Sequence, residues 1–345
     1  MEIKKSNITK SISEKMNRNI HKIKNHPIEI IKNKIYNYFG ESFKTFDDLD
    51  CKVKVEDNFD KLLIPKDHPA RSFSDTYYFD ENTCLRTHTS AHQNELLSKG
   101  YKKFLVTGDV YRKDEIDSCH YPVFHQMEGV CIIEGDKDEV EEFLKVLKGL
   151  VNHLFPGCEY RVSDDYFPFT NPSFEVEVKF NGEWLEILGG GIVQEKILQN
   201  NGITNHKAWA FGLGLERLAM ILFNIPDIRY FWTTDDRFLK QFESGEIIKF
   251  KEYSKYPPCH KDVSFWLNEE YNYNNFCEIV RDMGGDFVEE ISLIDNFTNS
   301  KTKKTSHCYR ITYRSNDRNL TNEEIDEIQK NVRNSLINEM KLELR

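Results

Sequence analysis

The sequence predicts an α+β protein with two domains, of which the first is the larger and is built on an antiparallel sheet flanked by helices. One observation is a run of alternating apolar and charged residues over 174–188, which turns back on itself at Asn181-Gly182. A second is the order of strand and helix patterns after residue 253, which is that of a smaller α+β domain. A length of 345 residues is enough for two such domains.

Residues 1–26 are expected to form a basic extension before the first domain. Seven Lys and Arg side chains against two Glu give this stretch a net charge of +5. It lacks the apolar centre of a secretory signal, and two interpretations stay open. The stretch is either the remnant of an organellar targeting segment or a solvated basic helix.

The first domain is expected over 27–232. Apolar residues at helical spacing predict a helix over 27–39, which begins at a proline, and a second amphipathic helix over 139–155. An apolar helix over 213–223 follows a pair of glycines. The stretch between the first two helices reads as loops and short strands over 45–90, a short helix over 92–99, and buried strands over 104–111 and 123–133.

The hairpin over 174–188 has a predicted register, because a two-residue turn fixes the pairing of its strands. Val178 then faces Leu185. Glu177 faces Glu186 in the same way. Like charges directly opposite each other destabilise a sheet, so this pair has two explanations. Either a cation such as Mg²⁺ lies between the carboxylates, or the face is solvated and the repulsion is tolerated.

The second domain is expected over 253–345, after a polar linker over 233–252 that contains one short helix and would permit a hinge. The predicted elements follow the order β-α-β-β-α-β, which is ferredoxin-like. They are a strand over 263–267, a helix over 274–283, strands over 287–294 and 308–314, a helix over 321–337 and a strand over 339–344.

Composition limits the class of function. A net charge of -10 argues against a protein that coats nucleic acid by charge alone, although it leaves room for a local basic patch. No apolar run approaches the length that spans a bilayer, so we expect no membrane partner. Eight cysteines without a C-x-x-C pair indicate free thiols. Cys119, His120 and His125 lie close together, but a second ligand pair at zinc-site spacing is missing.

One face of the strand over 123–133 is a candidate small-molecule site. Phe124, Gln126 and Glu128 alternate along it and therefore share a face. The aromatic ring suits stacking on a flat base, and the amide and the acid suit an ammonium group. The alternative is a polar sheet face at the domain surface.

Two arginines are candidates for binding phosphate. Arg112 ends the strand over 104–111, where its guanidinium can hold a phosphate through two hydrogen bonds. Arg217 lies in the first turn of the helix that follows Gly212-Leu-Gly214. That glycine pair is not a G-x-G-x-x-G or P-loop pattern and by itself favours an ordinary helix start.

Taken together, these segments resemble the signature motifs of class II aminoacyl-tRNA synthetases, and among them the single-chain, organellar phenylalanyl-tRNA synthetases. The resemblance covers nearly the whole chain, from about residue 19 to the end. Motif 2 resembles GDVYRKDEIDSCHYPVFHQME over 108–128, and motif 3 resembles GLGLERLAM over 212–220 with IPDIR over 225–229. RTHTSAHQ over 86–93 and FPF over 167–169 are similar to the family's pocket segments. The C-terminal unit resembles the family's anticodon-binding domain.

The resemblance implies a role for each matching residue. Arg112 and Arg217 would be the catalytic residues, on the α-phosphate and the β/γ-phosphates of ATP. Asn171 stands where related subunits often have an acid, which leaves no charge-based role there. The implied ATP site is Arg112, Cys119, His120, Tyr121, Phe124, Glu186 and Arg217. The implied phenylalanine site is Ser90, Ala91, His92, Gln93, Gln126, Met127, Glu128, Phe167, Phe169, Ala210 and Phe211. The implied metal ligands are Glu186 and Glu177.

The resemblance also implies the reaction and its setting. Phenylalanine, ATP and Mg²⁺ would give phenylalanyl-adenylate, and tRNA(Phe) would take the acyl group in the mitochondrial matrix. A single chain with both domains implies a monomer, and its length leaves no room for an editing domain. Two rival readings are a non-catalytic paralogue that binds tRNA or a metabolite, and a class II ligase that adenylates another acid. The presence of Arg112 and Arg217 argues against the non-catalytic paralogue. The pair of side chains Phe167 and Phe169 argues against a ligase for another acid.

Overall fold

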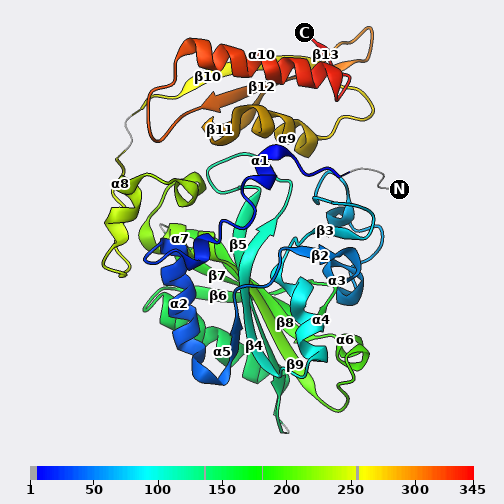
Figure 1. Cartoon of the computed structure of the whole chain (residues 1–345). Coiled ribbons are helices and arrows are strands. Elements are labelled where there is room, and N and C mark those ends of the chain that lie inside the picture. Colours follow the sequence, from blue (N-terminus) through cyan, green and yellow to red (C-terminus); the bar gives the residue numbers. More distant parts are fainter. Residues whose placement is uncertain (1–5, 136, 181, 254–255) are drawn as a thin grey trace.

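The computed structural model describes residues 6–135, 137–180, 182–253 and 256–345. The chain folds as a large sheet with helices on both faces, and a smaller α/β layer sits on one end of it (Figure 1). The predicted α+β class is confirmed, as is the antiparallel central sheet. No helix in these ranges is long and apolar enough to cross a bilayer.

The large sheet has the strand order β1-β4-β5-β9-β8-β7-β6. β1 pairs with β4 in parallel and every other pair is antiparallel. Its strands are β1 (Lys44–Phe46), β4 (Lys103–Tyr111), β5 (Val123–Ile133), β6 (Tyr160–Asp165), β7 (Thr170–Phe180), β8 (Glu183–Val193) and β9 (Lys207–Gly214). A separate two-stranded ribbon joins β2 (Lys52–Lys54) to β3 (Thr83–Leu85).

Helices cover both faces of this sheet, and strand periodicity decides which residues meet which helices. On one face, Leu105, Met127 and Trp209 pack in a core with the helices α2 (Pro27–Phe39), α5 (Glu139–Leu154) and α7 (Leu215–Phe223). On the other, Phe104 and Val130 pack against α4 (Gln93–Ser98) and α6 (Glu195–Asn200). Even-numbered residues of β5 therefore face the α4 side, and this includes the three candidate binding residues. The remaining short helix of this region is α3 (Val55–Asn58).

The hairpin of β7 and β8 has the predicted register. Val178 pairs with Leu185, and Glu177 pairs with Glu186. The turn residue Asn181 lies outside the described residues. The strands run further than predicted, and β6 and β9 were not predicted as strands.

The C-terminal domain has the predicted β-α-β-β-α-β order. Its sheet has the strand order β11-β12-β10-β13. The elements are β10 (Cys259–Trp266), α9 (Tyr273–Gly284), β11 (Val288–Thr298), β12 (Thr305–Tyr313), α10 (Asn322–Asn338) and β13 (Glu343–Leu344). Phe276 of α9 and Leu336 of α10 are buried with Ile311 of β12 in one core, as a ferredoxin-like fold requires.

Residues 233–252 differ from the polar linker that the sequence predicts. They hold one short helix, α8 (Asp236–Leu239), as expected. Phe238, Phe242 and Phe250, however, are buried in the core of the first domain. The prediction failed because three aromatic residues leave the average polarity of the stretch almost unchanged. Each of the three rings nevertheless fixes the stretch to the core of the first domain.

The buried ring of Phe238 gives a stability prediction. The side chain is 0% exposed, so Phe238→Ala should lower the free energy of unfolding by about 3–5 kcal/mol, through lost burial and a residual cavity. Ile248→Ala is the control, since Ile248 lies in the same stretch and is 38% exposed; it should change stability by less than about 0.5 kcal/mol. Urea unfolding followed by circular dichroism measures both. Equal small losses would mean that this stretch is a linker after all.

The N-terminal stretch over 6–26 packs against both domains and is not a solvated basic helix. Its helix α1 (Lys10–Ser13) is a single turn. Ile12 and Ile20 are buried in the core of the first domain. Lys15 Nζ lies 3.1 Å from Asp286 Oδ1 in the C-terminal domain. Figure 1 shows this blue segment running between the two domains beside α9.

The loop between β4 and β5 also joins the two domains. Ile116 is buried in the core of the C-terminal domain, and its carbonyl accepts a hydrogen bond from the N–H of Ile291 at 3.1 Å. The hydroxyl of Tyr121 donates to Asp286 Oδ1 at 2.6 Å. The loop that precedes the binding face of β5 is therefore held by residues of both domains.

Candidate active site

Two adjoining cavities open on the α4 side of the sheet. The first measures about 270 Å³ and the second about 350 Å³. Arg112, Gln126, Glu186 and Gly212 line both of them. Molecules bound in the two cavities would therefore meet at these four residues.

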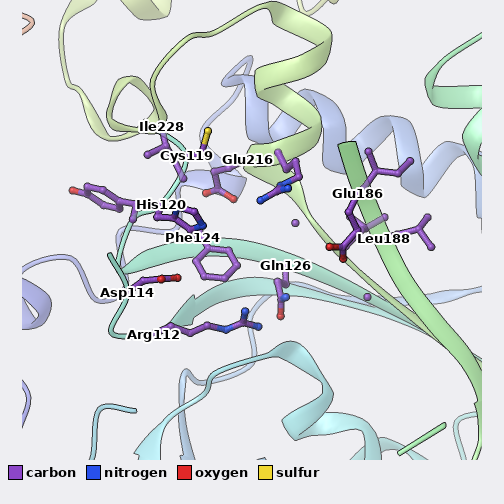
Figure 2. A pocket seen from close by; sticks show the side chains of 16 residues that line it. Arg112, Asp114, Cys119, His120, Phe124, Gln126, Glu186, Leu188, Glu216 and Ile228 are labelled. Atoms are coloured by element: carbon purple, nitrogen blue, oxygen red, sulfur yellow. The ribbon is translucent and has the colours of Figure 1, made fainter. Parts of the chain in front are cut away.

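The first cavity combines an aromatic surface with cationic side chains. The guanidinium of Arg112 lies 5.1 Å from the ring centre of Phe124, and its Nε donates to the carbonyl of Thr87 at 2.8 Å. Arg217 lines the cavity from the first turn of α7. Figure 2 shows Phe124, Gln126 and Arg112 together on one side of the cavity, with Glu186 reaching in from β8. This arrangement suits a flat base attached to phosphates.

His120 lines the first cavity beside an acidic partner. Its Nδ1 lies 2.8 Å from Asp117 Oδ2. The hydrogen bond to Asp117 raises the pKa of His120, against a smaller opposing effect of burial. The cationic form of the ring is thereby favoured, which suits a phosphate neighbour.

The paired carboxylates of the hairpin have different surroundings. Glu177 is engaged by Arg161, whose Nη2 lies 2.9 Å from Glu177 Oε1, and it lines neither cavity. Glu186 lines both cavities and has no hydrogen bond or ion pair among the described residues. Burial raises the pKa of Glu186, while Arg217 acts in the opposite direction. An exposed carboxylate at the cavity wall without a partner suits a cation or an ammonium group.

The second cavity has an aromatic wall that fits a small apolar ring. The rings of Phe167 and Phe169 lie 5.8 Å apart and nearly parallel, at 13°. Gly189 makes room for this wall, because a Cβ there would lie 2.6 Å from Cζ of Phe167. Ala210 lines the same cavity with a side chain that is 5% exposed.

A buried acid marks the polar end of the second cavity. Glu128 is 1% exposed, and neither carboxylate oxygen finds a hydrogen-bond partner among the described residues. Burial raises the pKa of Glu128 to about 8, and the nearby Ser90 hydroxyl offsets this slightly without forming a bond of ordinary geometry. Nε2 of the buried Gln93 also lacks a partner among the described residues. Unpaired buried polar atoms are costly, and a ligand with an ammonium group would satisfy Glu128.

Comparison with known proteins finds relatives over nearly the whole chain. Residues 9–242 match the model of the tRNA synthetases class II core domain (F), and residues 254–345 match the ferredoxin-fold anticodon binding domain. The chain is 54% identical to the chloroplastic/mitochondrial phenylalanine–tRNA ligase of Arabidopsis thaliana, over 99% of this chain and 83% of that protein. The mitochondrial phenylalanine–tRNA ligases of Dictyostelium discoideum (47% identical, covering 98% and 89%) and Mus musculus (45% identical, covering 96% and 84%) are also similar.

The chain belongs to the phenylalanine–tRNA ligase family. It has that family's class II synthetase core and its anticodon-binding domain.

In this ligase all seven residues of the expected ATP site line the first cavity. Most residues of the expected phenylalanine site line the second, and three do not. Met127 points to the opposite face of β5 and lies in the core. Ala91 is buried among apolar residues under the α4 side. Nε2 of His92 lies 3.0 Å from Arg86 Nη1, so this ring orients a buried arginine.

The second cavity also has lining residues that the sequence did not single out. His88 and Tyr166 belong to it; His88 lies within the segment over 86–93 that resembles synthetases, and Tyr166 directly precedes the one over 167–169. A strand or helix pattern could not have shown them, because both residues lie outside regular helices and strands. Asp114, Glu115 and His120 form the cluster of possible metal ligands among the described residues, in place of Cys119 and His125.

Proposed function

We propose that this chain attaches phenylalanine to tRNA(Phe) in two steps, through phenylalanyl-adenylate. The observation that carries the proposal is the pair of cavities that meet at Arg112, Gln126 and Glu186. One suits a nucleotide and the other an aromatic amino acid. An acyl phosphate forms where the carboxylate of one ligand reaches the α-phosphate of the other.

ATP fits the first cavity with its adenine on the ring of Phe124. Arg112, which stacks on the same ring, would contact the α-phosphate, and Arg217 would contact the β- and γ-phosphates. His120, Tyr121 and Cys119 close the cavity. The phenylalanine carboxylate attacks the α-phosphorus and pyrophosphate leaves. The protein supplies positioning and positive charge for this step, and no covalent nucleophile.

Phenylalanine fits the second cavity with its ring against Phe167 and Phe169. Its ammonium group would then meet Glu128, Gln126 and Gln93 at the polar end. Aromatic rings prefer offset or edge contacts, and the parallel wall of the two phenylalanines offers both. Ser90 borders the same end.

Mg²⁺ would be held by Glu186, which lines both cavities and has no ion pair among the described residues. Glu177 fits this role less well, because Arg161 engages its carboxylate. When bound, the ion supplies neutralisation of phosphate charge.

In the second step a hydroxyl of the terminal adenosine of the tRNA takes the acyl group. The C-terminal domain would bind the anticodon, which is what the domain family it matches is named for. A local surface on that domain must serve, because the chain as a whole carries a charge of -10.

ATP–pyrophosphate exchange with a panel of amino acids tests the first step. Exchange that depends on phenylalanine is expected. Exchange with a non-aromatic acid would identify another class II ligase, and no exchange with any amino acid would indicate a non-catalytic paralogue.

Selectivity against tyrosine should be modest. An apolar pocket such as the one that ends at Ala210 rejects an added hydroxyl by only about a hundredfold in kcat/KM. We also propose that neither matched domain hydrolyses a misacylated tRNA, since one is described as a synthetase core and the other as an anticodon-binding domain. Tyrosine-dependent exchange, and tyrosyl-tRNA that persists once formed, are therefore expected. Discrimination of about 10⁵-fold would contradict this prediction.

We further propose that the enzyme works in the mitochondrial matrix as a monomer. The location rests on the names of its relatives. The monomeric state rests on the presence of both domains in one chain. Sub-mitochondrial fractionation tests the location. Light scattering of the purified protein tests the monomer, and twice the chain mass would refute it.

A further inference from the structure

Strand β5 carries Phe124 and Gln126 into the site. At its N-terminal end, however, it has a neighbouring strand on one side only. β4 pairs with β5 throughout this end, down to Tyr111 and Val123. On the other side the pairing with β9 stops at Gln126 and Gly214. Beyond that point β9 turns into helix α7, so His125 and Phe124 have no neighbouring strand there.

Glu216 takes the place of the missing strand. Its Oε2 accepts a hydrogen bond from the backbone N–H of His125 at 2.7 Å. Its Oε1 lies 2.6 Å from His125 Nδ1, which donates because a carboxylate can only accept. Both side chains are buried, at 3% and 1% exposure. One carboxylate thus satisfies two buried donors of His125, the residue that lies between the binding residues Phe124 and Gln126.

The two ends of this link adjoin residues of the nucleotide cavity. Phe124 and Gln126 flank His125, and Arg217 follows Glu216 in the first turn of α7. Figure 2 shows Glu216 among the side chains that surround the first cavity. The ring of His125 is held from behind by Trp232, at 5.8 Å between ring centres.

We propose that Glu216 is a positioning residue for adenylate formation. By tying His125 to the start of α7, it sets the separation between the adenine-stacking ring of Phe124 and the guanidinium of Arg217. ATP must contact both at once, whereas phenylalanine contacts neither. The inference rests on the proposed function, since it assigns ATP to the first cavity.

The prediction is a selective loss of ATP affinity. Glu216→Ala leaves two buried donors without an acceptor, and a displacement of about 1 Å costs up to roughly a hundredfold in rate. We expect KM for ATP to rise at least about tenfold, with KM for phenylalanine at saturating ATP within about twofold. Glu216→Gln retains the shape and one acceptor, and should restore KM for ATP to within about threefold of wild type.

Two further variants separate positioning from folding. His125→Phe keeps a ring against Trp232 and the backbone N–H, but removes the Nδ1 donor, so it should show a smaller rise in KM for ATP alone. Gln329→Ala removes a buried partner of Tyr313, whose hydroxyl lies 2.9 Å from Gln329 Oε1 in the C-terminal domain. It should lower the melting temperature without changing either KM.

Exchange kinetics, melting temperature and calorimetric titration of ATP into the phenylalanine-free protein measure all four variants. Equal rises of both KM values, or a Glu216→Gln enzyme no better than Glu216→Ala, would overturn the proposal. If Glu216→Ala does not fold, His125→Phe decides: a rise in KM for ATP alone supports the proposal, and unchanged or equally raised KM values overturn it. Absence of exchange in the wild type would refute the proposed function instead, and calorimetry would still report whether Glu216 affects ATP binding.

Discussion

Arg112→Ala is expected to reduce the rate of phenylalanyl-adenylate formation by about 10²–10³-fold, the usual effect of removing one donor that stabilises developing negative charge. Arg112 lies where the two cavities meet, so its guanidinium is the cation best placed for the negative charge that develops around the α-phosphate in the transition state. The loss should appear mainly in kcat of pyrophosphate exchange. Burial lowers the pKa of Arg112, yet an arginine remains charged at any pH used for the assay.

Two variants control for charge and folding in that experiment. Arg112→Lys keeps the charge but cannot form the paired hydrogen bonds of a guanidinium, so it should recover only part of the rate. Arg310→Ala removes an exposed arginine of the C-terminal domain that pairs with Asp262, and should leave tRNA-independent exchange within about twofold. An Arg112→Ala enzyme as active as Arg310→Ala would remove Arg112 from the mechanism.

The second large effect concerns Glu128 and is a dependence on pH. Burial raises the pKa of this acid to about 8 in the free protein, so below that pH the side chain is protonated and neutral. The ammonium group of phenylalanine attracts the ionised form, and binding must then release a proton. KM for phenylalanine should therefore rise about tenfold for each unit that the pH falls below 8, and level off above it.

Glu128→Gln should abolish this pH dependence and weaken phenylalanine binding at pH 8.5. The weakening is expected to be about 2–5 kcal/mol, because the buried ammonium group loses its counter-charge. Exchange kinetics between pH 6 and 9 measure both enzymes, and KM for ATP in the same runs serves as the internal control. A wild-type KM for phenylalanine that is flat across this range would mean that Glu128 is already ionised or does not meet the substrate.

Sequence periodicity was most informative where strands are regular. Alternation placed Phe124, Gln126 and Glu128 on one face of β5, and the Asn-Gly turn fixed the register of the hairpin. β9 was missed because its apolar residues run into the glycine pair before α7, and this pair by itself favours a helix start. β6 was missed because it is a polar strand at the edge of the sheet.

The residues of the site could be predicted only in part, and mainly through the resemblance to synthetases. Consecutive residues in the turn over Thr89–His92 point in different directions, so a motif that places Ser90 in the cavity also contains Ala91 and His92, which lie outside it. The ion pair of Glu177 with Arg161 depends on the pairing of β6, an element that the sequence did not reveal. Tertiary neighbours decided these residues, and spacing along the chain does not record them.

The burial of Ile116 in the C-terminal domain limits how freely the two halves can be recombined. A catalytic fragment that stops before residue 256 would expose this side chain to water and release the backbone that Arg281 holds, whose Nη2 lies 2.7 Å from the carbonyl of Asp114. A transplanted anticodon-binding domain would have to present equivalents of Arg281, Ile291 and Asp286 to the same loop. Chimeric ligases made by joining domains at the boundary are thus expected to fail unless the loop before β5 is exchanged together with its partner.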